Sequence, residues 1–307
     1  MAYHLLPWIL FNIFIVCMLA IDLFFHRKNR VISIREAVGW TLFWIVIALL
    51  FNLYIYYDRG PDDALKFLTG YLIEKSLSVD NLFVFLLIFK YFHTPPSSLH
   101  KVLFWGVLGA ILLRALFIWL GIVLIANFSW MVYVFGVFLV YTGIRLWMEK
   151  DKKIHPENNP LIKIFRYLFR FTKDYEEDKF FVRKSGQYFA TPLFVVLLSI
   201  ETTDVLFAID SIPAILAITY DPFLVYTSNI FAILGLRSLF FVLSHVMTLF
   251  HYLHYGLSLI LIFIGTKMII IDVFKIPTVA ALGFVFLVLI ASVLLSLIFP
   301  ENKSKEF

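Results

Sequence analysis

The apolar run from Pro192 to Thr219 is long enough to cross a lipid bilayer, yet three carboxylates interrupt it: Glu201, Asp204 and Asp210. A bilayer core needs roughly 20 apolar residues in helical form. An ionisable group at membrane depth costs on the order of 3 kcal/mol on insertion scales, so such groups usually face a cavity or a charged partner. The run therefore predicts a membrane helix that carries part of a polar site.

An earlier apolar run repeats this pattern of acids. Both runs place, in order, an acid, five further residues, a second acid and a small polar side chain. The residues are Glu74, Asp80 and Asn81 in the first run and Asp204, Asp210 and Ser211 in the second. Two matched acidic insertions predict one site that is assembled from two copies of a repeat.

The composition places the whole chain in the membrane. Of its 307 residues, 62% are hydrophobic and 15% are charged, and the mean hydropathy is +0.90. Soluble domains carry roughly 25% charged residues, so we predict an all-α, polytopic membrane helical bundle. The single cysteine, Cys17, excludes an intrachain disulfide and a thiolate metal cluster. The first apolar run lacks a basic region before it, so no cleavable signal peptide is predicted.

Counting about 20 apolar residues per span predicts nine transmembrane helices in a single domain, 1–307. The chain between the fifth and sixth helices, 149–189, is predicted to be a cytoplasmic loop. Within it, 160–171 is typical of a basic amphipathic helix on the membrane surface, and 180–189 predicts a small hairpin. The nine predicted helices cover about 5–25, 33–57, 65–92, 99–125, 130–148, 192–219, 222–245, 253–271 and 277–299.

The distribution of basic residues predicts the orientation. With the N-terminus outside and the C-terminus in the cytoplasm, eighteen Lys and Arg residues lie in the inner segments and three lie outside. The positive-inside rule favours this arrangement. It also accounts for the net charge of +5 without nucleic acid as a partner.

The repeat extends beyond the acids. Ala110-Ile-Leu-Leu-Arg114 parallels Ala232-Ile-Leu-Gly-Leu-Arg237, and Gly143-Ile-Arg145 parallels Gly265-Thr-Lys267. Predicted helices 3–5 (about 65–148) thus match helices 6–8 (about 190–272). Because each copy has three helices, the copies are expected to lie in opposite orientations, as in transporters with a site near the midplane.

These residues also resemble a known family. Ile73-Glu-Lys-Ser-Leu-Ser-Val-Asp-Asn81 and Val205-Leu-Phe-Ala-Ile-Asp-Ser-Ile-Pro-Ala-Ile215 are similar to the two signature segments of the TerC/Alx family. Phe180-Phe-Val-Arg-Lys and Ala190-Thr-Pro-Leu resemble its bacterial Alx branch. The resemblance implies a multi-pass protein of the bacterial inner membrane whose activity is manganese export; the family's names also refer to tellurium resistance and alkaline induction.

The acids themselves predict a cation site. Oxygen ligands suit hard divalent ions such as Mn²⁺, Mg²⁺ and Ca²⁺, and none of the eight histidines falls in mid-membrane. No resident cofactor is predicted; Mn²⁺ would be the transported ion. The predicted ligands are Glu74, Asp80, Asn81, Glu201, Asp204, Asp210 and Ser211, with Asp22 and Ser78 as accessory candidates.

A purely structural role for the acids is the alternative. Arg114 and Arg237 each lie in the helix that follows an acidic helix, and we predict that both are structural ion-pair partners of the acids. On a regular helix the two acids of a pair point about 120° apart. Either each helix has two polar faces, or it is unwound so that both acids converge. Pro213 favours a break in the sixth helix, and Gly70 permits one in the third.

Three functions compete at this point. The first is a secondary transporter that exports a hard divalent ion, with the proton as a candidate coupling ion, because no nucleotide-binding fingerprint is present. The second is a non-transporting stress or redox modulator of the membrane, although the chain has no evident redox carrier. The third, an intramembrane aspartyl protease, needs one close carboxylate dyad, whereas the repeat offers two equivalent pairs. We predict the transporter and no enzyme; the sequence leaves the oligomeric state open.

The predicted topology can be tested with reporters. A reporter fused after Asp174 should report a cytoplasmic position, and one inserted near Gly60 should report the outside, because an odd number of spans separates them. Enzymatic reporters that are active on only one side of the membrane measure this directly. Finding both positions on the same side would contradict the nine-helix assignment and the inverted repeat.

Overall fold

The computed structural model describes residues 2–25, 33–128, 130–148, 170–172, 174–184, 187–246, 252–274 and 276–298. Helices dominate these residues, and their ends lie within a few residues of the predicted ends. The surface helix predicted for 160–171 lies outside the described residues except for its last two, which form a strand. The helices are α1 (Ala2–Phe25), α2 (Ile34–Arg59), α3 (Pro61–Tyr91), α4 (Pro96–Asn127), α5 (Met131–Met148), α7 (Pro192–Leu216), α8 (Pro222–Ile233), α9 (Leu236–Val246), α10 (Leu253–Ile269) and α11 (Thr278–Ile298).

The bundle is built from apolar, membrane-crossing helices. By length and composition, α2, α4, α5, α7 and α11 can each cross a membrane, and the bent pair α8 and α9 makes a sixth span if it is counted as one. Shorter apolar stretches lie in α1 and α10. The all-α membrane bundle is confirmed, whereas the number of nine spans stays a prediction.

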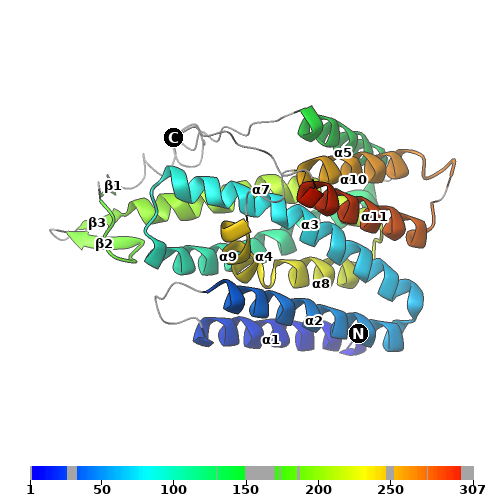
Figure 1. Cartoon of the computed structure of the whole chain (residues 1–307). Helices are drawn as coiled ribbons and strands as arrows, with labels where there is room; N and C mark the ends of the chain where they lie inside the picture. The colour runs from blue at the N-terminus through cyan, green and yellow to red at the C-terminus, as the bar shows by residue number, and fades with distance from the viewer. Residues whose placement is uncertain are drawn as a thin grey trace.

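The helices lie side by side, with a small sheet at one end (Figure 1). Helices α1 and α2 form one flank, and α5, α10 and α11 form the opposite flank. Helices α3, α4, α7, α8 and α9 lie between them. Two clusters of buried apolar side chains fill the interior, one towards each flank, and α3 and α7 contribute to both.

Large apolar side chains cover the outside of the bundle. Soluble proteins avoid contiguous exposed apolar patches of this extent, so the surface fits contact with lipid chains. The exposed residues include Leu10 and Val16 on α1, Leu42 and Leu50 on α2, Leu112 and Trp119 on α4, Val137 on α5, and Phe286 and Leu287 on α11.

Helices α5 and α10 approach each other closely through glycine. A Cβ atom added to Gly265 would lie 2.6 Å from the carbonyl oxygen of Gly136, and one added to Gly143 would lie 2.8 Å from that of Ser258. Small residues allow such close packing of membrane helices. The predicted repeat aligns Gly143 with Gly265, and the same offset aligns Gly136 with Ser258. Each of the two contacts then corresponds to the other. The two-fold relation itself stays a prediction.

Local signals set several helix ends. The hydroxyl oxygen of Ser33 accepts a hydrogen bond from the backbone N–H of Glu36 at the start of α2 (3.3 Å). The carboxylate of Asp221 accepts from the N–H groups of Phe223 and Leu224 at the start of α8 (2.8 and 3.1 Å). Pro192 is the first residue of α7. These ends were predicted from the sequence.

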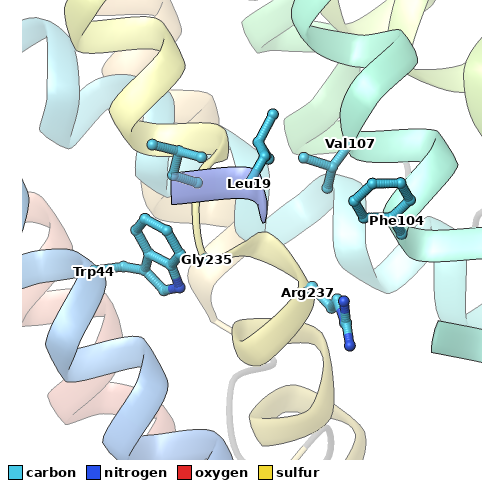
Figure 2. A pocket seen from close by; sticks show the side chains of 7 residues that line it. Leu19, Trp44, Phe104, Val107, Gly235 and Arg237 are labelled. Atoms are coloured by element: carbon cyan, nitrogen blue, oxygen red, sulfur yellow. The ribbon is translucent and has the colours of Figure 1, made fainter. Parts of the chain in front are cut away.

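The predicted helix over 222–245 is wrong as a single element, because it breaks between α8 and α9 with a bend of 40°. Gly235 has φ +80° at the break, and its Cα faces the side chain of Trp44. Figure 2 shows Trp44 beside Gly235. The small pocket there is lined by Leu19, Trp44, Phe104, Val107, Leu234, Gly235 and Arg237.

The break favoured at Pro213 is also wrong, and the one that Gly70 permits is not formed. Helix α7 continues past Pro213 to Leu216, and α3 continues past Gly70 to Tyr91. Pro213 lies in the last turn of α7, where a missing hydrogen bond precedes the end of the helix and need not bend it. Gly70 instead serves close packing, because a Cβ there would lie 2.9 Å from the hydroxyl oxygen of Ser228.

The small sheet has the strand order β1-β3-β2. Strands β2 (Phe181–Lys184) and β3 (Gln187–Ala190) form the predicted antiparallel hairpin, and β1 (Arg170–Phe171) pairs parallel to β3. The hydroxyl of Tyr175 donates to the carbonyl oxygen of Phe92 (2.8 Å), which ties this region to the end of α3.

Substitution of Gly265 tests the close packing of α5 on α10. Gly265→Ala should destabilise the protein by about 1–3 kcal/mol, because the new methyl group meets backbone atoms that cannot move away easily. Gly283→Ala in α11 is the matched control: nothing lies within 4 Å of a Cβ there, so it should be neutral or stabilising. Thermal unfolding in detergent measures both; equal melting temperatures for the two variants would contradict the packing.

Candidate functional site

The guanidinium group of Arg114 lies at the centre of a buried polar cluster. Its side chain is 0% exposed. It forms an ion pair with Glu74 and two hydrogen bonds to Asp204, from Nε (3.4 Å) and from Nη2 (3.2 Å). Its Nη1 also donates to Ser211 Oγ (3.3 Å) and to Asn229 Oδ1 (3.4 Å). One cation thus holds two carboxylates and two neutral oxygens.

Four helices position this cluster. Arg114 comes from α4 and Glu74 from α3, while Asp204 and Ser211 lie two turns apart on one face of α7. Asn229 comes from α8, whose residues are buried from Phe223 to Ile233. Because α8 lies in the interior of the bundle, its one asparagine, Asn229, reaches the cluster.

Glu201 lies one turn before Asp204 but outside this cluster. Its carboxylate packs against Gly109 of α4, where an added Cβ would come within 2.1–2.5 Å of the carboxylate atoms. The Oε2 atom is buried and has no hydrogen-bond partner among the described residues. Gly109 therefore provides the space that this carboxylate occupies.

The remaining predicted ligands divide into two groups. Ser78 and Asn81 are buried, and Ser78 Oγ and Asn81 Nδ2 have no hydrogen-bond partner within the described part of the chain. The side chains of Asp22, Asp80 and Asp210 lie outside the described residues. Among the side chains that are described, no three His, Cys, Asp or Glu residues stand close enough to hold a metal ion. The convergence of four acids stays a prediction.

The structure joins Glu74 and Asp204 through a guanidinium group. This is the contact that the sequence predicted for Arg114. The second predicted partner, Arg237, is buried on α9, and its Nη2 lies 3.4 Å from Nδ1 of His100.

Residues 59–304 match the family described as the integral membrane protein TerC family. The match covers most of the chain and includes every residue of the Arg114 cluster. The chain belongs to the TerC family. No solved structure matches it.

Relatives of this TerC-family protein match over nearly their full length. The chain is 48% identical to the "Uncharacterized membrane protein STKORF319" of Myxococcus xanthus over 95% of this chain and 92% of that protein. It is 45% identical to the "Putative membrane-bound redox modulator Alx" of Salmonella typhi over 98% and 97%. The Escherichia coli K12 protein of the same name is 44% identical over 95% and 94%.

Sequence reasoning did not predict the contacts of two polar residues of this interior. Asn229 follows Thr227 and Ser228 in α8, and an amide in a membrane helix is a signal of a buried hydrogen bond. Lys75 donates from Nζ to the carbonyl oxygens of Ala232 (3.2 Å) and Leu234 (3.4 Å) at the end of α8. A glycine at position 235, three residues beyond Ala232, was the available signal for that helix end.

Removal of one carboxylate tests the stabilising part of the cluster. Asp204→Asn should lower the free energy of unfolding by about 3 kcal/mol, because it leaves the buried guanidinium with one anionic partner fewer. Asp63→Asn is the control: Asp63 forms a surface ion pair with Lys66 (3.0 Å), and such pairs are worth less than about 1 kcal/mol. Unfolding by heat in detergent compares them, and a larger effect at Asp63 would contradict this assignment.

Proposed function

We propose that this TerC-family protein is a secondary transporter that exports a hard divalent cation, Mn²⁺, from the cytoplasm. The observation that supports the proposal most strongly is the Arg114 cluster. Carboxylates from α3 and α7 meet there at one buried positive charge, although the two helices are distant in the chain. Ionisable groups inside membrane helices are typical of ion pathways.

The chemistry of the oxygens supports the choice of ion. Carboxylate, hydroxyl and amide oxygens are ligands of Mn²⁺, Mg²⁺ and Ca²⁺. No described histidine contacts the Arg114 cluster, and the lone cysteine, Cys17, is exposed on α1. We take Mn²⁺ as the substrate because the TerC/Alx resemblance implies it. Glu74, Asp80, Asn81, Glu201, Asp204, Asp210 and Ser211 are the proposed ligands.

The proposed orientation follows from the basic residues. The segments predicted to be cytoplasmic carry most of them, so the sheet end of the bundle faces the cytoplasm. The membrane is then the inner membrane of a bacterium. Mn²⁺ would enter from the sheet end and leave from the end at which α8 begins.

Protons are the proposed coupling ion. Glu201 forms no ion pair within the described residues, and its carboxylate lies one turn from Asp204 on α7. A carboxylate without a counter-ion can exchange a proton as the cation enters or leaves. Exchange of protons for Mn²⁺ would supply energy without nucleotide hydrolysis.

The names of the Alx relatives favour a second candidate, a membrane-bound redox modulator. That function needs an electron or thiol carrier. Within this chain, Cys17 is the only thiol. A redox role would therefore depend on a partner or cofactor that supplies the carrier, and it predicts no ion flux by the purified protein.

Flux measurements on purified protein in proteoliposomes separate the two candidates. Wild-type protein should move Mn²⁺ across the membrane faster than Zn²⁺, because the ligands are oxygens. Mg²⁺ and Ca²⁺ are compared in the same assay, with protein-free vesicles as the control. No flux of any of these ions above that control would contradict the transporter.

Asparagine variants test the acids that define the repeat. Asp80→Asn and Asp210→Asn should each reduce Mn²⁺ flux by roughly tenfold or more, because desolvation of a divalent ion is no longer offset by two full sets of anionic ligands. The exposed Glu177→Gln serves as the control. The amount of folded protein in the membrane is measured in parallel. Unchanged flux in both Asp variants would contradict the proposed site.

A further inference from the structure

Four groups surround the Arg114 guanidinium, and three of them, Glu74, Asp204 and Ser211, are proposed ligands of the transported ion. Two carboxylates, a hydroxyl and an amide oxygen face it, from Glu74, Asp204, Ser211 and Asn229, at 3.2–3.4 Å where hydrogen bonds are formed. Hard divalent ions bind such oxygens at about 2.0–2.6 Å. The guanidinium fork occupies the place that such an ion would take.

We propose that Arg114 is a tethered cation, which fills the transport site when no metal ion is bound and must withdraw before Mn²⁺ can bind. This inference rests on the proposed function. It assigns to Arg114 a role beyond ion pairing: the residue competes directly with the substrate for Glu74 and Asp204.

Mn²⁺ and the Arg114 guanidinium cannot occupy the site at the same time, for reasons of both charge and space. The same carboxylate oxygens cannot coordinate Mn²⁺ while they accept hydrogen bonds from Nε and Nη2 of Arg114. Like charges at such short range in a buried site repel strongly. The guanidinium also cannot lose its proton to relieve the repulsion. Binding of Mn²⁺ therefore requires that Arg114 moves away.

The presence of Arg114 stabilises the protein when no metal ion is bound. When the ion leaves, two buried carboxylates would otherwise remain in the bilayer without a counter-charge. Arg114 compensates one of these two charges and forms ion pairs with carboxylates from both α3 and α7. The empty site can then reorient without a bound metal ion, which a secondary exporter requires in every cycle.

A structural ion pair and a tethered cation predict opposite effects on binding. If Arg114 only stabilises the fold, its removal leaves Mn²⁺ affinity unchanged or lower. If Arg114 competes with Mn²⁺, its removal raises the affinity. A competitor that occupies the site in nine of ten molecules lowers apparent affinity about tenfold.

The experiment measures Mn²⁺ binding to full-length protein in detergent by isothermal titration calorimetry. We expect Arg114→Met to bind Mn²⁺ about tenfold more tightly than wild type, and to export it more slowly in proteoliposomes. Unchanged or weaker binding by folded Arg114→Met would overturn the inference.

A milder variant covers the case in which Arg114→Met does not fold. Asn229→Leu keeps Arg114 and every proposed ligand of the ion, because Asn229 is not one of them, but it removes the acceptor of one Nη1 hydrogen bond. It should therefore bind Mn²⁺ several-fold more tightly. Thr227→Val is its control on α8, because the Thr227 hydroxyl donates to the carbonyl oxygen of Phe223 (2.7 Å) and not to the cluster. Equal Mn²⁺ affinity of Asn229→Leu, Thr227→Val and wild type would overturn the inference.

Failure of this inference is distinguishable from failure of the proposed function. Wild-type protein that neither binds nor moves Mn²⁺ contradicts the transporter. Wild-type protein that binds and exports Mn²⁺, with variants that bind no more tightly, contradicts the tethered cation alone.

Discussion

The buried guanidinium of Arg114 is the group on which the interior of this bundle depends. A charge at membrane depth is stable only beside opposite charges or in contact with water, and guanidinium remains charged under all ordinary conditions. Arg114 therefore requires Glu74 and Asp204 beside it, and this requirement fixes α3, α4 and α7 relative to one another. Apolar packing does not set these positions so closely, because apolar contacts are non-directional, whereas a planar fork has defined hydrogen-bond directions.

A second, partly buried cation, Lys75, stabilises the break between α8 and α9. The last carbonyl groups of a helix have no partner inside that helix, and α8 ends within the bundle. Lys75 donates to two of them, at Ala232 and Leu234, and a positive charge is favourable at a helix C-terminus. Lys75 follows Glu74 directly in the sequence. Lys75 thus contacts the helix break, and Glu74 contacts Arg114. A shift of α3 would therefore alter both places.

Local sequence signals predicted the helix ends, whereas tertiary contacts decided the rest. The predicted helix over 222–245 and the observed α8 begin at the same residue, where Asp221 forms a cap that depends on neighbouring residues alone. Pro213 misled the prediction, since a proline in the last turn does not bend a helix. The break at Gly235 was visible as one additional residue between Ala232 and Arg237 relative to the earlier copy. The partners of Arg114 were predicted by charge, but Asn229 was not, because only the fold brings α8 to the cluster.

The two predicted copies agree in backbone packing and differ at Gly235. Gly136 packs on Gly265, and Gly143 packs on Ser258, which is the reciprocal pattern of two related halves. Helix α4 nevertheless runs unbroken through Arg114, while its counterpart breaks. An inverted repeat that carries ions exchanges the conformations of its halves between states. The additional glycine belongs to the sequence, however, so the break cannot pass to α4. In the proposed exporter, alternation would therefore come from movement of whole helices and from the contacts around Arg114.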